Sequence, residues 1–377
     1  MPLEFLTGTR VLDLSQFLPG PFATQMLADM GADVVKIEPP KGDPMRALDP
    51  VTNARGPSPY HALVNAGKRI VTLDLKSDDG KEAFTALVRR ADILMESYRP
   101  GVMERLGFGP AELKRLNPAL VHCALSGYGQ NGPMRLVGGH DINYVAAAGQ
   151  LGLTGPGTKP HMAYPMVADY AGAMQSVTAI LGALVGRGRT GRGAYLDVAM
   201  ADSVLAWQSQ ALSALARGDA PGRDTSLLTG GAAFYGVYET GDGKFVALGA
   251  IENVFWENFC NAVGHPDLIT RQNDPLPQTA LIDEVAAIFK SKSRAEWDAE
   301  LGDVDCCYHP VLAMDEVADH PQNTARGLIR PQAGLEDDNG VSVLLPFWTD
   351  ETPPAPRAPM RDALASDVVK EWEGEGD

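Results

Sequence analysis

The first 130 residues alternate short apolar runs, rich in β-branched residues, with segments of helical periodicity. The runs with the length and composition of buried strands are "RVLDLS", "ADVVKIE", "RIVTLDL", "ADILMES" and "LVHCALSG". Helical patterns separate them: "FATQMLADM", "SDDGKEAFTALVRR", which Ser77 suits as an N-cap, and "PAELKRLN". Single helices between strands predict a parallel sheet with helices on both faces. We therefore expect a doubly wound α/β domain.

The pattern changes in the second half of the chain. A long helix, "DYAGAMQSVTAILGALVGRG", precedes a strand and a helix in "GAYLDVAMADSVLAWQSQALSALA". From about residue 225, two alternating runs flank Gly241–Gly243 and predict an antiparallel hairpin, followed by the short helices "LIDEVAAIFKSK" and "SRAEWDAEL". We expect a large domain beginning with residues 1–205, a smaller α+β domain at 225–330, and a return segment at 331–377 that completes the large domain. This last segment has a hairpin signal at Asn339 and Gly340, a proline-rich stretch and a short helix.

Charge and composition limit the kinds of partner. Among 377 residues, 48 are acidic and 32 are Lys or Arg, which gives a net charge of -16. Such a field repels nucleic acid and anionic membranes, so neither is an expected partner. No stretch approaches 18 uninterrupted apolar residues and the first residues have no signal-peptide pattern, so we expect a cytoplasmic protein.

The cysteine pattern predicts neither a metal site nor a disulfide framework. The four cysteines, Cys123, Cys260, Cys306 and Cys307, show no C-x-x-C spacing. Cys123 sits in an apolar strand-like run, where a buried, inert thiol is the expected role. We expect no bound metal.

One motif suggests a nucleotide and is rejected. "GRGRTG", residues 186–191, matches G-x-G-x-x-G, which requires a strand before the glycines and a helix after them. Here a helical pattern precedes and a strand pattern follows. The loop therefore marks a helix carboxyl end with favourable basic residues, not a dinucleotide site.

The loops that follow the predicted strands are the expected ligand-binding segments, because ligands of such sheets lie beyond the carboxyl ends of the strands. They are "SQFLPGP", "PPKGDPMR", "SYRPGV" and "SGYGQNGP". Glycine and proline also mark ordinary turns, so composition alone does not separate the two interpretations.

His140 and Asp169 are the two candidate proton-transfer residues. In "GGHDINYVAAAG", His140 opens a helical run, where the positive end of the helix dipole favours a neutral imidazole. A helix-opening histidine without catalytic function is the alternative. Asp169 starts the next long helix, where an N-cap is an equally sufficient role.

The chain resembles the class III CoA-transferase superfamily, and within it the α-methylacyl-CoA racemase branch. The resemblance rests on "LTGTRVLDLSQFLPGPFATQMLADMGADVVKIEPPKGDPMR", "VTLDLKS", "SYRPGVMERLGFGP", "SGYGQNGP" and "GGHDINYVAAAG", and it continues to "DGKFVALGAIE" and "HPQNTARG". It implies an acyl-CoA thioester as substrate, a role in fatty acid metabolism, no separate cofactor, and an interlocked homodimer.

The resemblance also implies a mechanism of 1,1-proton transfer. His140 and Asp169 are the implied bases on opposite faces of the α-carbon, with backbone amides around Asp141 stabilising the enolate oxygen. Glu252 matches a glutamate that hydrogen-bonds the histidine from the partner subunit, although a surface glutamate after a strand is an alternative. The family alternative is a CoA-transferase, in which Asp169 is a nucleophile that forms an anhydride and then a thioester. A non-catalytic acyl-CoA binding protein is disfavoured because both bases are present.

The implied CoA-binding positions carry over residue by residue. Pro39 stands where some racemases have an arginine, so we consider Lys36, Lys41 or Arg46 as its substitute. Arg99 and Arg105 suit phosphates as permanently charged donors, though either could be an ordinary solvated arginine. The full set is Lys36, Arg46, Leu73, Asp74, Leu75, Lys76, Ser97, Tyr98, Arg99, Arg105, Gly139, Asp141, Ile142, Asn143 and Tyr144.

Overall fold

The computed structural model describes residues 3–48, 58–332 and 340–374. The chain divides into two units: Met1–Ala148 with Pro165–Ala206 and His320–Asp377, and Gly149–Tyr164 with Trp207–Asp319. This division differs from the expected one, because residues 149–164 belong to the smaller unit and the return segment begins at His320. Of the predicted hairpin signal near the end, Asn339 lies outside the described residues.

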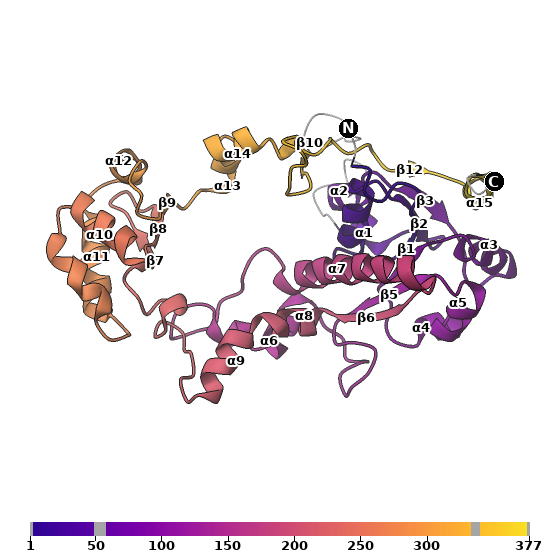
Figure 1. The fold of residues 1–377 in the computed structure, drawn as a ribbon, viewed down its shortest axis with the longest axis horizontal. Coiled ribbons are helices and arrows are strands. Elements are labelled where there is room, and N and C mark those ends of the chain that lie inside the picture. Colours follow the sequence, from indigo (N-terminus) through magenta and orange to yellow (C-terminus); the bar gives the residue numbers. More distant parts are fainter. Residues whose placement is uncertain (1–2, 49–57, 333–339, 375–377) are drawn as a thin grey trace. The chain divides into compact units, whose positions relative to one another are not determined.

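The larger unit contains the predicted parallel sheet (Figure 1). Its strands are, in chain order, β1 Arg10–Leu14, β2 Asp33–Glu38, β3 Arg69–Thr72, β4 Ile93–Glu96, β5 Val121–Ser126, β6 Tyr195–Ala199 and β12 Arg361–Asp362. They lie in the order β12-β3-β2-β1-β4-β5-β6, and every pairing is parallel. The chain therefore continues from β1 toward β2 and β3 on one side, and returns to add β4 on the other.

Helices cover the sheet as its buried, near-continuously apolar strands require. One face carries a core in which Leu12, Val35 and Leu94 pack with Phe84 and Trp372 from the covering helices. α1 packs on α7, which also contacts β5 and β6 (Figure 1). The helices are α1 Pro19–Asp29, α2 Pro59–Asn65, α3 Asp78–Val88, α4 Val102–Leu106, α5 Pro110–Leu116, α6 Asp141–Ala147, α7 Val167–Thr190, α8 Met200–Trp207, α14 Pro321–Arg326 and α15 Ala365–Gly374.

The smaller unit is α+β, with an antiparallel sheet in the order β7-β8-β9. Its strands are β7 Tyr235–Glu239, β8 Phe245–Gly249 and β9 Tyr308–Pro310, and the predicted hairpin is the β7–β8 pair. Trp256, Phe259, Phe289 and Trp297 form its aromatic core. Its helices are α9 Ser209–Ala216, α10 Asn253–Ala262, α11 Thr279–Lys290, α12 Arg294–Leu301 and α13 Met314–Val317. In the larger unit, β10 Ile329–Pro331 pairs with β11 Val341–Val343.

The glycine motif at residues 186–191 lies at a helix carboxyl end, as its flanking patterns indicate. α7 continues through Gly186 and Gly188 to Thr190, and Gly191 caps it in the left-handed region at φ 68°. Arg187 pairs with Asp92 at 2.8 Å. The segment therefore offers no loop between a strand and a helix start.

Three further sequence expectations can be compared with the described residues. The four cysteines are free thiols, and burial raises the pKa of Cys123 to about 12. Within the described ranges, no cluster of His, Cys, Asp and Glu side chains could hold a metal ion. None of the helices described is both long enough and apolar enough to cross a membrane.

Candidate active site

A cavity of about 490 Å³ opens at the carboxyl ends of the central strands of the larger unit. It lies where β1 and β4 are neighbours but their following connections run to opposite sides of the sheet, which is the switch point that favours ligand binding. Among the residues that line it are Gln16, Phe17, Ser97, Tyr98, Arg99, Arg105, Tyr128, Arg135, Gly139, His140, Tyr144 and Asp169. The cavity thus brings together eight of the predicted site residues.

The segment after β4 is held in place by a buried carboxyl group. The N–H of Tyr98 donates to Glu96 Oε2 at 2.7 Å, and the N–H of Gln16 donates to Ser97 Oγ at 3.0 Å. Burial raises the pKa of Glu96 to about 8 despite the hydrogen bond from Tyr98. The loops after β1 and β4 are therefore tied to each other at the wall of the cavity.

Three arginines give the cavity a positive lining in a chain that is strongly acidic. Arg99, Arg105 and Arg135 are exposed and line the cavity together. Within the described part of the chain, none of these guanidinium groups forms an ion pair. Guanidinium groups left without carboxylate partners are available to phosphate or carboxylate groups of a ligand.

His140 occupies the N-cap position of α6, with extended backbone at φ -129° and ψ 177°. Its own N–H donates to Asn143 Oδ1 at 3.0 Å, so the start of the helix is closed by a side chain three residues later. Tyr144 Oη donates to the carbonyl oxygen of Gly139 at 2.6 Å, which fixes the preceding glycine. The exposed His140 side chain thus extends from a backbone that two side-chain hydrogen bonds hold.

Asp169 is not the N-cap of α7, which corrects one of its two expected roles. The helix begins at Val167 after an N-cap at Met166, so Asp169 is its third residue. The cap comes instead from Asp141, whose Oδ1 accepts the N–H groups of Ala168 at 2.6 Å and Asp169 at 3.1 Å. Burial, and then the charge of Asp141, raise the pKa of Asp169 to about 7.

Other predicted site residues lie outside this cavity. Leu73, Asp74, Leu75 and Lys76 follow β3, two strands away from β1, and only Leu75 is buried. Ile142 and Asn143 belong to the first turn of α6 without lining the cavity. Glu252 lies in the smaller unit, exposed, immediately before α10.

Lys36 is placed where it cannot contact a ligand phosphate, which corrects the expectation for this residue. Its side chain is 1% exposed, and its ammonium pairs with Asp43 at 2.9 Å and donates to the Ser15 carbonyl at 2.7 Å. Arg46 is partly exposed but pairs with Glu38 at 2.8 Å. Both side chains are therefore already paired with carboxylates, and neither is the free cation expected to replace the arginine that some racemases have at the position of Pro39.

The comparisons with known proteins agree with one another. The model of CoA-transferase family III matches residues 6–363, nearly the entire chain. The chain belongs to CoA-transferase family III. Alpha-methylacyl-CoA racemase of Homo sapiens is 37% identical over 336 residues, which are 85% of this chain and 81% of the relative. Acetyl-CoA:oxalate CoA-transferase of Acetobacter aceti is 33% identical over 378 residues, 97% of this chain and 95% of the relative.

Solved structures extend the family III match to three dimensions. The crystal structure of a CAIB/BAIF family protein from Brucella suis superposes with a TM-score of 0.81 at 26% identity, covering 97% of this chain and 99% of that chain. The family thus holds both racemases and transferases at comparable identity. The chain is an enzyme of this family III group, and the site residues must indicate which reaction it performs.

Sequence reasoning missed several residues of the family III cavity. It identified the loop containing Gln16 and Phe17 and the loop containing Tyr128, but selected no residue from either. Phe17 adopts a positive φ of 62°, which is rare for a non-glycine residue and often marks a functional site. Arg135 stands in the sequence between "SGYGQNGP" and "GGHDINY", where no periodic pattern is present. Its positive charge close to "GGHDINY" is the one feature that could have identified it as a ligand-binding residue.

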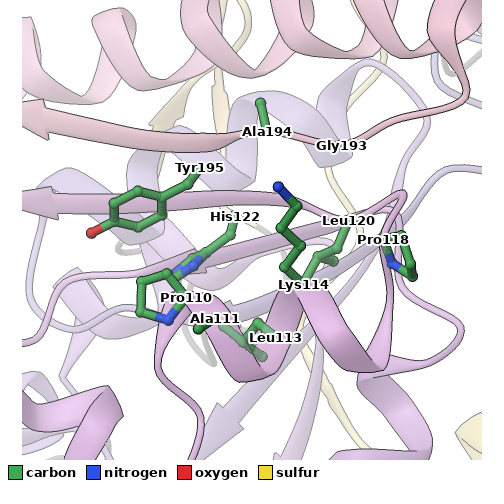
Figure 2. A pocket seen from close by; sticks show the side chains of 10 residues that line it. All are labelled: Pro110, Ala111, Leu113, Lys114, Pro118, Leu120, His122, Gly193, Ala194 and Tyr195. Carbon is green, nitrogen blue, oxygen red and sulfur yellow. The ribbon is translucent and has the colours of Figure 1, made fainter.

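A second cavity, of about 220 Å³, lies at the amino-terminal ends of β5 and β6 (Figure 2). His122 and Tyr195 line it together with apolar side chains of α5, and their ring centroids are 4.9 Å apart. The imidazole of His122 is buried, and neither ring nitrogen has a hydrogen-bond partner among the described residues. Burial lowers the pKa of His122 to about 4, so it is neutral.

Proposed function

We propose that this family III enzyme interconverts the two configurations of a 2-methylacyl-CoA thioester by removing and returning the α-proton. The observation that carries the proposal is that His140 and Asp169, at the starts of α6 and α7, line the same cavity as unpaired arginines. Two proton-transfer groups and a cationic lining are what an acyl-CoA racemase requires.

The proposed mechanism conserves electrons and needs no redox partner. One base takes the α-proton, and the C–H electron pair moves into the thioester, giving an enolate. The other group, protonated beforehand, delivers a proton to the opposite face, and the enolate electrons form the new C–H bond. A free backbone N–H in the first turn of α6, at Asp141, is the proposed donor to the enolate oxygen.

The pKa of Asp169 suits a group that both accepts and returns a proton. At about 7, the carboxyl group is present in both protonation states at neutral pH, so it can act as acid in one direction and base in the other. A carboxylate nucleophile, in contrast, must be ionised to attack a thioester. A group with a pKa of about 7 is present in this ionised form too at neutral pH, so dependence on His140 is what separates the two reactions.

The CoA part of the substrate is proposed to follow the cationic and polar lining. Arg99 and Arg105 meet phosphate oxygens, with Arg135 as an additional donor, while the segment Leu73–Lys76 after β3 contacts the nucleotide end. We also propose that the enzyme is a homodimer in which Glu252 of one subunit hydrogen-bonds His140 of the other. Its substrate would then belong to lipid metabolism.

The alternative reaction is CoA transfer, which the similarity to the Acetobacter aceti transferase favours. In that reaction, the Asp169 carboxylate attacks the thioester carbonyl and expels CoA thiolate, which leaves an acyl anhydride of Asp169. CoA thiolate then attacks the Asp169 carbonyl of this anhydride and releases the donor acid, which gives an enzyme thioester. An acceptor carboxylate takes CoA from this thioester by way of a second anhydride, and Asp169 is regenerated. His140 has no necessary role in this sequence. The two candidates therefore differ in their dependence on one side chain.

Variants of the two bases test the proposal. His140→Ala and Asp169→Asn should each lower racemisation at least about 100-fold, in line with the loss of a general acid–base group, while CoA affinity changes little. Racemisation is followed by chiral separation of the products, and CoA affinity by calorimetry. Arg192→Gln, an exposed substitution outside the cavity, is the matched control. Full activity of His140→Ala, or an acyl adduct of Asp169 trapped by hydroxylamine, would favour the transferase.

A further inference from the structure

Asp141 makes contacts that the proposed reaction does not itself require. It is the first residue of α6, directly after His140, yet its side chain does not serve its own helix. Its Oδ1 accepts two N–H groups from the first turn of α7, those of Ala168 at 2.6 Å and Asp169 at 3.1 Å. Met166, the N-cap residue of α7, provides no side-chain hydrogen bond there.

We propose that Asp141 is the positioning residue of this site. Its carboxylate fixes the first turn of α7, and Asp169 with it, against the start of α6 that carries His140. The proposal deepens the function proposed above, since it rests on His140 and Asp169 being the two bases. In this role the Asp141 side chain contacts neither the substrate nor the transferred proton, and only its backbone N–H is the proposed donor to the enolate oxygen.

The Asp141 side chain links the two helix starts that carry His140 and Asp169, so it affects the distance between these bases. His140 and Asp141 are consecutive, so the backbone of the first is fixed relative to the carboxylate of the second. That carboxylate binds the backbone N–H of Asp169 directly. Because displacements of about 1 Å can reduce catalysis about 100-fold, a tether between the backbones of two bases is a strong constraint on rate.

The same contact changes the charge environment of Asp169. Burial is the first cause of its raised pKa, and the negative charge of Asp141 is the second. The other titratable or charged residues that line the cavity with Asp169 are Tyr98, Arg99, Arg105, Tyr128, Arg135, His140 and Tyr144. The pKa of Tyr144 is raised to about 12, by burial first and by Asp169 next. Removing the charge of Asp141 should therefore lower the pKa of Asp169.

Two substitutions separate position from charge. Asp141→Asn keeps an oxygen that can accept both N–H groups but removes the charge, whereas Asp141→Ala removes both. We expect Asp141→Asn to lose less kcat than Asp141→Ala, with the pH at which Asp169 ionises shifted downward. We expect Asp141→Ala to lose kcat about 10- to 100-fold, with KM for the acyl-CoA little changed.

The test combines pH–rate profiles of α-proton exchange with carbon-13 NMR titration of carboxyl groups, with the Asp169 signal assigned by Asp169→Asn. Ser293→Ala removes a comparable cap from α12 in the smaller unit, where Ser293 Oγ accepts from Glu296, and serves as the control for lost stability. Thermal unfolding shows that each variant is folded.

The outcomes separate this proposal from the proposed function. A lower Asp169 titration midpoint in Asp141→Asn, with a larger kcat loss in Asp141→Ala than in Asp141→Asn, supports the positioning role. An unchanged midpoint in Asp141→Asn together with wild-type kcat in Asp141→Ala overturns it. If the wild-type protein exchanges no α-proton, the racemase proposal fails, while the NMR midpoint still decides whether Asp141 controls Asp169.

Discussion

His122 and Asp169 are ionisable side chains whose pKa values burial moves in opposite directions. The pKa of Asp169 rises to about 7 and that of His122 falls to about 4, because burial penalises the charged form of each. The pKa of Glu96 shifts in the same direction as that of Asp169 and is raised to about 8. Asp169 lines the larger cavity, whereas His122 lies at the other end of the strands. Burial thus brings the pKa of Asp169 near neutrality, where proton exchange is possible, and makes the stability around His122 depend on acidic pH.

His122→Leu should stabilise the larger unit, by about 1 kcal/mol at neutral pH, because it removes a buried polar ring without a hydrogen-bond partner among the described residues, where Glu96 Oε1 lies 3.9 Å from Nε2. The folded pKa of His122 is lowered from 6.5 to about 4, so the unfolded chain binds this proton more readily and the protein loses stability as pH falls from 6.5 toward 4. The variant should lose less stability than wild type between pH 7.5 and 5.

Urea denaturation midpoints at these two pH values provide the measurement. His161→Leu, at an exposed position of the smaller unit, is the control. An equal drop in midpoint for His122→Leu and wild type would show that His122 does not carry this pH dependence.

At the scale of elements, the site depends on the starts of two helices and on the turn that follows β5. Gly127, in that turn, lies directly against the ring of Tyr144, which holds the Gly139 carbonyl ahead of His140. A Cβ atom added at Gly127 would be 2.6 Å from Tyr144 Cζ and Oη. The Tyr144 ring cannot relieve this contact by a small rotation of a flexible side-chain end, so the ring as a whole has to move.

Gly127→Ala should therefore displace Tyr144 and disturb the start of α6. We expect kcat/KM to fall at least about tenfold and stability to fall by about 1–3 kcal/mol, the usual cost of overpacking. The matched control is Gly182→Ala on the exposed side of α7, where a Cβ meets nothing within 4 Å and should add about 0.5–1 kcal/mol of helix stability. Steady-state kinetics and thermal unfolding measure both effects. Wild-type kinetics in Gly127→Ala would contradict this account of the turn.

The elements were more predictable from sequence than the contacts between them. Alternation of apolar runs and helical patterns located β1 to β6 of the parallel sheet within a few residues, but did not predict β12. The rule about carboxyl ends selected loops that surround the larger cavity. An N-cap was the alternative expected role of Asp169, besides that of a base, because aspartate favours that position. The actual cap, Asp141, is 27 residues before Ala168 in the chain, and no local pattern encodes such a contact.

Burial of charge was the second property that local patterns could not reveal. Lys36 lies in the run "ADVVKIE", where its charge suggested a ligand contact, but its strand is buried and Asp43 lies 2.9 Å away to pair with it. Arg135 was missed for the converse reason, because only the folded chain brings it beside Arg99 and Arg105. Both cases depend on tertiary contacts of a single charged side chain.

At the scale of the whole molecule, the chain combines a large parallel-sheet unit with a smaller α+β unit, and its return segment adds β12 to the edge of the large sheet. The family III match spans both units. Large apolar side chains remain exposed on α9, where Leu212 and Leu215 are 49% and 55% exposed. Exposed apolar residues that cluster on one element commonly mark a protein–protein contact.

We therefore predict a homodimer in solution. Sedimentation equilibrium should give about twice the chain mass of 40.2 kDa. Leu212→Glu combined with Leu215→Glu should weaken the dimer, since two charges would replace apolar contacts. A monomeric mass for the wild-type protein at micromolar concentration would contradict the prediction.

The central claim is that His140 and Asp169 exchange the α-proton of an acyl-CoA thioester through an enolate. The most direct measurement incubates one pure enantiomer of a 2-methylacyl-CoA with the wild-type protein in heavy water, without any acceptor acid. The account predicts deuterium at the α-carbon together with loss of optical purity, and convergence of both enantiomers on the same mixture. An α-carbon that stays protonated and chiral until a free acid is added, with transfer of CoA to that acid, would contradict it.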